Sequence, residues 1–547
     1  AILRRVRCVQ DVIYFGKGHS QMKKISTIAV ACAGLLSFTA CNNFLDEEPK
    51  STLTDVAYYK TQSQMESNVN YLYRTGAIGS YVDFGSAYIG PFASIQEELT
   101  GYFSNSYEGQ EIVCRYTREL TRQQNTMQLA SKMDKVWDDC YRGINVANGA
   151  IKHMPEVPMD QATADRLTAE AKFFRAFNYF YLVKTFGAVP FYTDPYELAE
   201  NMELPRTETS TIYNQIESDL KDAMNVLPEV TFAANGHRIT KYVAAMTLTD
   251  VYMYQHKYAE AAETVRIVVN SNHKLTTNDD LAMNSAFNKL RSTDDLDEAI
   301  YAYEYDNQIS PSNWLPTYAF DGDASSNGLF GTYAITQKVH GPNDRYLNIY
   351  ESNDLRRQPN QFYHWTYTNP KTGKVWNSVG NAACCWYYYD EDALLTTGRG
   401  TKDWNVYRYA EALLDAAESI AQSTGVTAEA AGYLAQVKAR ANMEGKTAAE
   451  IASSLQSMGK QAFIEECWTE RLRELPLEFK MWDMCVRTGM FPNISETTPG
   501  QVTYIPLVGA KNASGATIKE SDLLWPLSVN EIQRNPSLTQ NEGYSAK

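Results

Sequence analysis

Aromatic rings with amide neighbours are the residues of this chain whose types and spacing suit ligand binding. Trp314 and Tyr318 stand in a stretch interrupted by prolines, and Asn307, Gln308 and Asn313 lie close by. A flat ring offers an apolar face to the CH groups of a sugar, and amide side chains hydrogen-bond its hydroxyls. This stretch is the first candidate for a carbohydrate-stacking site, and core packing of the same rings is the alternative.

Two other stretches combine rings and polar side chains in the same way. One contains Tyr102 and Tyr107 with Asn105 between them, and the other contains Trp365 next to His364. The chain holds 37 tyrosines and 9 tryptophans, so most of these rings are expected in the core. Tyr102, Tyr107 and Trp365 therefore rank behind Trp314 as ligand-binding candidates.

Neighbouring carboxylates raise the question of an enzyme. A glycoside hydrolase needs two of them about 5–10 Å apart in a cleft, and the pairs to consider are Glu97 with Glu98 and Glu304 with Asp306. Such neighbours are common in a chain with 65 Asp and Glu against 50 Lys and Arg. The sequence contains no G-x-S-x-G, H-E-x-x-H or P-loop pattern. We therefore expect a binding protein with no catalytic residues and no cofactor.

The formal net charge of −15 narrows the choice of partner. Nucleic acids and anionic lipid surfaces attract basic proteins, so neither is expected to be the main partner of this acidic chain. An acidic surface does suit a protein that stays soluble at a crowded cell exterior.

The segment before Cys41 has the order of a secretory signal. Met22–Lys24 form a basic start, an uncharged apolar run follows, and small residues precede Cys41. The run is shorter than the roughly 20 residues of a spanning helix. Because the segment Phe38–Cys41 resembles the bacterial lipobox, Cys41 is expected to carry a lipid anchor. Residues 22–40 are then a lipoprotein signal peptide, and residues 1–21 are expected to be an extension of the gene model.

The cysteines after Cys41 show no functional spacing. None of them forms a C-x-x-C pair or has a histidine at zinc-finger distance, so no metal site is expected. Six cysteines scattered over a chain of this length do not make a disulfide framework. They are Cys114, Cys140, Cys384, Cys385, Cys467 and Cys485.

Long helices must position these candidates in the first half of the chain. Apolar residues recur at steps of three and four, and prolines and glycines mark the ends. The pattern predicts helices over residues 127–154, 163–186 and 210–227, and two helices within 241–269 joined around Gln255–Tyr258. Consecutive helices with small residues between them indicate tetratricopeptide-like pairs, although no clean 34-residue period can be aligned.

Residues 271–400 have a different character, because glycine, proline and asparagine are frequent and long helical periods vanish. Alternating tyrosines predict a short strand around 301–305, and Asn369–Gly373 predict a hairpin turn. Loops this long are usually functional. Helices are expected to return at 406–421, 428–441 and 462–485, the last broken at Pro476.

Seven segments, taken together and in order, resemble the SusD/RagB family. The most recognisable is the run from Ala169 to Pro190, and a mild departure is Lys480-Met481 before Trp482. The other resembling residues are Ser51–Asp55 with Tyr58-Tyr59; Trp137, Tyr141, Ile144 and Asn148; Arg206, Tyr213, Asp219-Leu220 and Ala223; Arg408–Glu411 with Ala417-Glu418; Glu470-Arg471, Glu474-Leu475, Trp482-Asp483 and Arg487–Gly489; and Trp525-Pro526, Glu531, Asn535-Pro536 and Gln540–Tyr544.

The resemblance implies a mainly α fold with about four tetratricopeptide-like helix pairs, irregular aromatic-rich loops and short strands. It implies a single SusD-like domain over residues 41–547, with a helical part at 41–270. The part at 271–547 would hold the ligand-binding loops and the C-terminal RagB/SusD segment. Charged motif residues such as Glu170, Arg175 and Arg471 are expected to be paired internally, because an unpaired buried charge is costly.

The resemblance also implies a function at the cell surface. Members are lipid-anchored to the outer membrane, bind a nutrient, often an oligosaccharide, and present it to a partner TonB-dependent transporter of the SusC kind. Three alternatives stay open at this point: a peptide cargo, a pure helical scaffold without a small ligand, and a glycoside hydrolase. The acidic run Asp46–Glu48 resembles the signal that sends such lipoproteins to the surface.

Overall fold

The computed structural model describes residues 59–75, 92–195, 203–306, 313–330, 336–396 and 398–545. The predictions for residues 1–21, for the signal peptide at 22–40 and for Cys41 lie outside these residues. Among the described residues, no helix combines the length and the apolar character that crossing a membrane requires.

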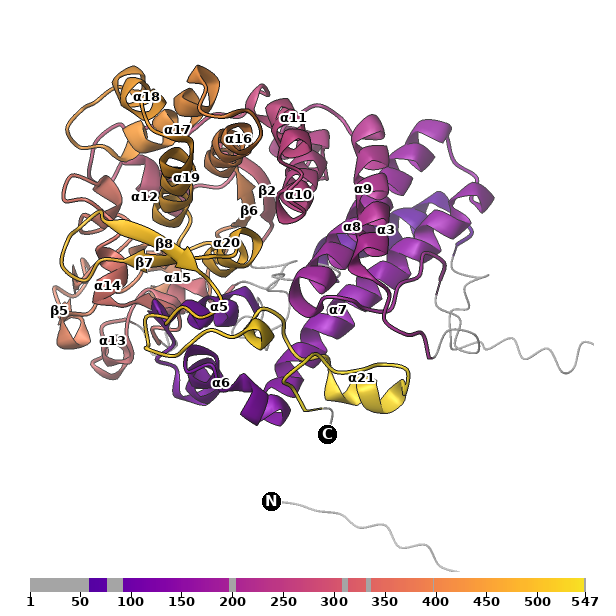
Figure 1. Cartoon of the computed structure of the whole chain (residues 1–547), viewed down its shortest axis with the longest axis horizontal. Coiled ribbons are helices and arrows are strands. Elements are labelled where there is room, and N and C mark those ends of the chain that lie inside the picture. Colours follow the sequence, from indigo (N-terminus) through magenta and orange to yellow (C-terminus); the bar gives the residue numbers. More distant parts are fainter. Residues whose placement is uncertain are drawn as a thin grey trace, which may run out of the picture. The chain divides into compact units, whose positions relative to one another are not determined.

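A row of helices makes up the first half of the described chain, and each helix packs against the next (Figure 1). The observed helices agree with the predicted ranges to within a few residues. They are α3 (Gln62–Thr75), α7 (Thr126–His153), α8 (Gln161–Phe186), α9 (Thr209–Val226), α10 (Lys241–Tyr254) and α11 (Tyr258–Val269). The shorter α5 (Phe92–Glu97) and α6 (Glu108–Arg118) precede α7.

Helix α8 shows why these boundaries can be read from the sequence. Asp160 caps its start, because its carboxylate accepts the backbone N–H of Thr163 at 2.9 Å. Gly187 ends it with φ of 74°, a backbone conformation that side chains other than glycine rarely adopt. Between these ends α8 is buried on most of its circumference, as expected for a helix in the middle of a row.

The row continues after an interruption of more than a hundred residues. Helix α16 (Tyr409–Thr424) packs on α11, and α17 (Ala428–Ala441) packs on α16. Helices α18 (Ala448–Gln456) and α19 (Lys460–Glu474) follow, and α20 (Met481–Thr488) comes after the predicted break at Pro476. The predicted fold class, mainly α with tetratricopeptide-like pairs, is therefore confirmed.

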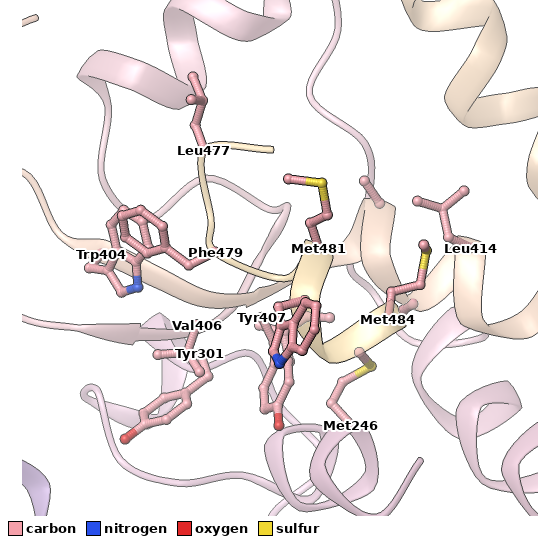
Figure 2. Packing of buried hydrophobic residues seen from close by; sticks show 14 of the residues in the cluster. Met246, Tyr301, Trp404, Val406, Tyr407, Leu414, Leu477, Phe479, Met481 and Met484 are labelled. Atoms are coloured by element: carbon pink, nitrogen blue, oxygen red, sulfur yellow. The ribbon is translucent and has the colours of Figure 1, made fainter. Parts of the chain in front are cut away.

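One predicted helix start is wrong. Val406–Arg408 were expected in a helix, but they belong to strand β6 (Trp404–Arg408), which pairs antiparallel with β2 (Ala299–Tyr303). Aromatic and β-branched side chains favour the extended form here. Val406 and Tyr407 of the strand are buried in the same hydrophobic cluster as Met246 of α10 and Met484 of α20 (Figure 2). The predicted strand around residues 301–305 is confirmed by β2.

The remaining described strands form three more two-stranded sheets: β1 (Phe103–Ser104) with β3 (Gly341–Pro342), β4 (Thr366–Thr368) with β5 (Val375–Asn377), and β7 (Met490–Ile494) with β8 (Val502–Pro506). The hairpin turn predicted at Asn369–Gly373 joins β4 to β5. The Asn369 side chain accepts the N–H of Lys371 at 2.9 Å, and Gly373 has φ of 69°.

Short helices punctuate the irregular regions between the sheets. They are α12 (Ala286–Ser292), α13 (Gly322–Ser326), α14 (Asp344–Leu347), α15 (Glu391–Thr396) and α21 (Val529–Arg534). The region 271–400 therefore carries the long irregular segments that its composition predicts, and these segments supply most of the walls of the candidate site.

Charged motif residues are paired inside the protein, as expected. Arg175 donates to both oxygens of Asp219 at 2.8 Å, and Arg471 lies 2.7 Å from Asp415. Arg408, fully buried, contacts carboxylates from three segments: Glu298 at 2.8 Å, Glu474 at 2.7 Å and Glu478 at 2.6 Å. The three carboxylates and Arg408 form a cluster that joins the start of β2, the end of β6 and the end of α19. We call it the Arg408 cluster.

His340 is a buried histidine with an aromatic environment. Its ring stacks on Phe103 with centroids 4.1 Å apart and meets Phe479 edge-on at 4.9 Å. Burial lowers the pKa of His340 to about 3, whereas in an unfolded chain it is about 6.5. Below pH ~6.5 the unfolded state therefore binds a proton that the folded state does not bind. The contribution of neutral His340 to the free energy of unfolding is therefore complete above about pH 6.5 and is lost as the pH falls towards 3.

Replacing His340 by phenylalanine is expected to remove this acid sensitivity. Between about pH 6.5 and about pH 5 the native protein should lose about 2 kcal/mol more unfolding free energy than the variant, since one proton contributes about 1.4 kcal/mol per pH unit. Urea unfolding at both pH values measures the difference. The same replacement at His153, half-buried beside Glu156 at the end of α7, is the control. Equal pH slopes for His340→Phe and the native chain would contradict the prediction.

Candidate functional site

A cavity that opens to solvent lies beside the first residues of β6. Five separate parts of the chain form its wall: the end of α12, the segment around Asn313, the aromatic residues 387–390, residues 400–405 at the start of β6, and Glu478. Its lining residues are Leu290, Arg291, Asn313, Leu315, Pro316, Tyr387, Tyr388, Tyr389, Asp390, Gly400, Lys402, Asp403, Trp404, Asn405 and Glu478. We call it the aromatic cavity.

The aromatic wall is built by a single turn of 3-10 helix over Trp386–Tyr388. The turn sends Tyr388 into the core, where its hydroxyl donates to the Leu477 carbonyl at 2.7 Å. Tyr387 stays half-buried at the cavity, and Tyr389 stacks on Trp386 with ring centroids 4.2 Å apart. Trp404, which also lines the cavity, stacks on Phe479 with ring centroids 5.3 Å apart (Figure 2). The rings are thus fixed before any ligand arrives.

Arg291 places a cation at this wall. Its Nη1 donates to the Tyr389 carbonyl at 2.6 Å, and its guanidinium lies over the rings of Tyr389 and Trp386 at 5.3 and 5.4 Å. Burial lowers the pKa of Arg291, but the group keeps its charge. Its Nε donates to the Asn288 side-chain oxygen at 3.2 Å, so the guanidinium is held in place beside the cavity that Arg291 lines.

Two carboxylates, Asp390 and Asp403, add hydrogen-bond acceptors to the wall of the cavity. Asp390 accepts the N–H of Ala393 at 2.9 Å, and Asp403 accepts that of Tyr305 at 2.8 Å. Burial, together with the nearby Asp294, raises the pKa of Asp403 to about 6. Rings, a fixed arginine and oriented carboxylates in one cavity are the chemistry that holds a polyhydroxylated ligand.

A second cavity, also open to solvent, adjoins the first. The two share Leu290, Lys402, Asp403 and Asn405 in their walls. The second is acidic, because Asp295 and Asp297 also line it. Lys402 is engaged by Asp294, with its ammonium 2.8 Å from the carboxylate.

The first-ranked candidates of the sequence lie at or behind the aromatic cavity. Asn313 lines it, but its amide is used internally, donating to the Lys402 carbonyl at 2.8 Å. Trp314 is only 6% exposed, and the guanidinium of Arg399 covers its ring at 4.7 Å. Tyr318 is 1% exposed and meets Tyr388 edge-on, so it is a core residue in this structure.

The other candidates do not line this cavity. Tyr102 is fully buried, donates its hydroxyl to the Pro492 carbonyl at 2.6 Å and leaves no ring surface for a ligand. Tyr107 and Trp365 are half-buried elsewhere. The proposed ligand contact at Tyr102 is therefore corrected to core packing, which was the alternative for every ring.

The residues that sequence reasoning missed are Arg291, Tyr387, Tyr389, Trp404 and Asn405. A signal existed for the two tyrosines, because residues 362–389 are visibly rich in rings. No local pattern marks Arg291 or Asn405, which the fold brings to the same wall from segments more than a hundred residues apart.

The first carboxylate pair considered for hydrolysis has a structural role. Glu97 is fully buried and accepts the N–H groups of Met481 and Trp482 at 3.0 and 3.2 Å, at the start of α20. Glu98 is paired with Arg118 at 3.0 Å. The described surroundings of this pair therefore show a helix cap and an ion pair.

Two family models match this chain. The first, described as "Starch-binding associating with outer membrane", matches residues 43–253, and the second, described as "SusD family", matches residues 344–544. Together they cover the helical row up to α10, its continuation from α16 onwards and the C-terminal tail, but not α11.

Known proteins that resemble this chain in sequence or in structure also carry SusD names. The SusD-like protein P2 of Formosa agariphila is 26% identical over 93% of this chain and 98% of its own length. A SusD superfamily protein from Parabacteroides distasonis has a similar structure, with a TM-score of 0.73, 24% identity, and coverage of 88% of this chain and 99% of that chain.

The surface glycan-binding protein A from Bacteroides thetaiotaomicron was solved in complex with laminarihexaose. It superposes with a TM-score of 0.67 at 17% identity, covering 89% of this chain and 100% of that chain. At this identity the match concerns the fold. The sequence matches on both halves and the shared fold lead to one conclusion: the chain belongs to the SusD/RagB family.

Proposed function

We propose that this protein binds an oligosaccharide in the aromatic cavity and is not an enzyme. The observation that carries the proposal is the combination in one cavity of a half-buried ring, Tyr387, with the fixed Arg291 and the carboxylate of Asp390. Sugar rings present apolar CH faces and a rim of hydroxyls, which match rings and charged hydrogen-bonding groups respectively. The starch- and glycan-binding names of its relatives support this ligand class.

The proposed cellular role is nutrient capture. The protein would be anchored to the outer membrane by a lipid on Cys41, exposed at the cell surface, and would deliver its ligand to a partner TonB-dependent transporter of the SusC kind. Residues 41–547 would act as one domain, with residues 1–21 and 22–40 absent from the mature chain. The outer-membrane association in the description of the first family model supports this location.

Titration calorimetry of the purified protein against a panel of starch, β-glucan and other oligosaccharides tests the ligand. Saturable binding of at least one glycan is expected, with no new reducing ends after prolonged incubation. Binding of peptides but of no glycan would favour the peptide-carrying alternative. If neither glycans nor peptides bind, the pure-scaffold alternative is favoured. If a glycan is cleaved and Glu304→Gln abolishes the cleavage, the hydrolase alternative is favoured.

Replacing Cys41 by alanine is expected to release the protein from membrane fractions, because the acyl chains that hold it would be missing. Fractionation of cells that express the native and the variant chain measures this. Replacement of Cys114, a buried cysteine of α6, is the matched control and should leave the protein with the membranes. A Cys41→Ala variant that stays in the membrane pellet after a high-salt wash would contradict the lipid anchor.

A further inference from the structure

Three side chains with metal-binding atoms meet beside the acidic cavity. They come from separate segments: His237 follows α9 by a short loop, Asp295 precedes β2, and Glu304 follows it. Nε2 of His237 lies 2.8 Å from the Asp295 carboxylate, and Nδ1 lies 3.5 Å from that of Glu304. One donor atom from each residue lies within 4.8 Å of the other two.

The surroundings of this group are short of positive charge. Asp294 and Asp403 lie close to Asp295 and Glu304, and the cation among them, Lys402, is engaged by Asp294. Among the described residues, the charged groups around Glu304 are therefore mostly carboxylates.

The groups that face His237 are nearly all acidic. They are Asp295, Glu304 and Asp403, with the ring of Phe232 at 5.5 Å as the apolar contact. The neighbouring cation along the chain, Arg238, is directed elsewhere, with its Nε donating to Glu170 at 3.0 Å. A proton on His237 adds a single charge, whereas a divalent ion adds two.

We propose that His237, Asp295 and Glu304 bind a divalent transition-metal ion, and that Zn²⁺ is the ion best matched to them. One imidazole and two carboxylates are ligands that zinc accepts at about 2.0–2.2 Å. Because the two carboxylates face different nitrogens of the His237 ring, binding of one ion requires rotation of these partly exposed side chains. Asp295 also lines the acidic cavity, so one of the three ligands borders a space open to solvent.

This site is independent of the glycan proposal, because none of its three residues lines the aromatic cavity. It also differs from the sequence-based expectation, which placed no metal anywhere in the chain. That expectation considered cysteine spacing, and these ligands are separated by 58 and 9 positions along the chain, with no cysteine among them. Only the fold brings them together.

Calorimetric titration of the full chain with ZnCl₂ at about pH 7.5 tests the proposal. Saturable binding of one ion is expected, and His237→Asn and Glu304→Gln should each weaken it at least about tenfold. Asparagine suits position 237, where φ is 59°, because it tolerates the left-handed conformation better than most residues. Circular dichroism and the melting temperature of each variant establish that it is folded.

His153→Asn is the matched control. His153 pairs with Glu156 at 2.9 Å at the end of α7, so it offers a histidine and a carboxylate without the third residue of the proposed site. Zinc affinity should be unchanged in this variant, and in the native chain it should fall as the pH is lowered from about 7.5 to about 6, since protons compete for His237. No saturable zinc binding, or binding that folded His237→Asn retains in full, would overturn the proposal.

Discussion

Replacing Arg408 by methionine is expected to lower the free energy of unfolding by about 3–5 kcal/mol, the range for removing one partner of a buried ionic group. Arg408 is fully buried, and Glu298, Glu474 and Glu478 lie around its guanidinium at 2.6–2.8 Å. Methionine keeps much of the length of the side chain but leaves three buried carboxylates with less positive charge. Urea unfolding at about pH 7 measures the loss.

Arg266→Met is the matched control for this prediction. Arg266 makes two hydrogen bonds of 2.8 Å to Glu429, but both side chains are 39% exposed. An exposed pair contributes about 0–1 kcal/mol, so the same substitution should cost far less here. If Arg408→Met unfolds at the same urea concentration as Arg266→Met, the Arg408 cluster does not contribute the predicted free energy of unfolding.

The second large effect concerns the ligand. Replacing Tyr387 by alanine is expected to weaken binding of the preferred oligosaccharide by about 30-fold, because truncation of a central ring at a binding site costs about 2 kcal/mol. Tyr387 is half-buried at the aromatic cavity, so its ring is already positioned and loses little freedom on binding. Titration calorimetry with the best glycan of the panel measures the change.

Two further variants sharpen this experiment. Tyr387→Phe keeps the ring and should retain most of the affinity, whereas Tyr71→Ala removes a tyrosine that is 38% exposed on α3 and should have no effect. Trp314→Ala separates the aromatic cavity from the site first expected from the sequence. Unchanged affinity in Tyr387→Ala together with a large loss in Trp314→Ala would move the site to the Trp314 segment.

The helical part of the fold could be predicted because its signals are local. The apolar period of α8, its cap at Asp160 and its stop at Gly187 all lie within one stretch of sequence. The turn at Asn369–Gly373 is local in the same way. Strand β6 could not be predicted, because it runs directly into α16 without a breaker and its partner β2 lies about a hundred residues earlier.

The site was less predictable for a similar reason. Ring content and nearby amides indicated carbohydrate chemistry, but they did not distinguish Tyr387, which is half-buried at the cavity, from Tyr102, which is completely buried. Exposure depends on contacts between distant segments. Arg291 and Asn405 meet at one wall only after β2 and β6 have paired, and no pattern along the chain records that meeting.

The packing of α16 on α11 has a consequence for how the protein folds. The two helices are separated by residues 270–408, so a large entropic cost must be met before their contact forms, and contacts of this range slow folding. Until then the buried residues of α11, among them Val265 and Val268, lack part of their cover. A chain that ends before residue 409 lacks α16, so the uncovered face of α11 should make it aggregate. In the intact chain this face stays exposed until α16 has folded and packed on it.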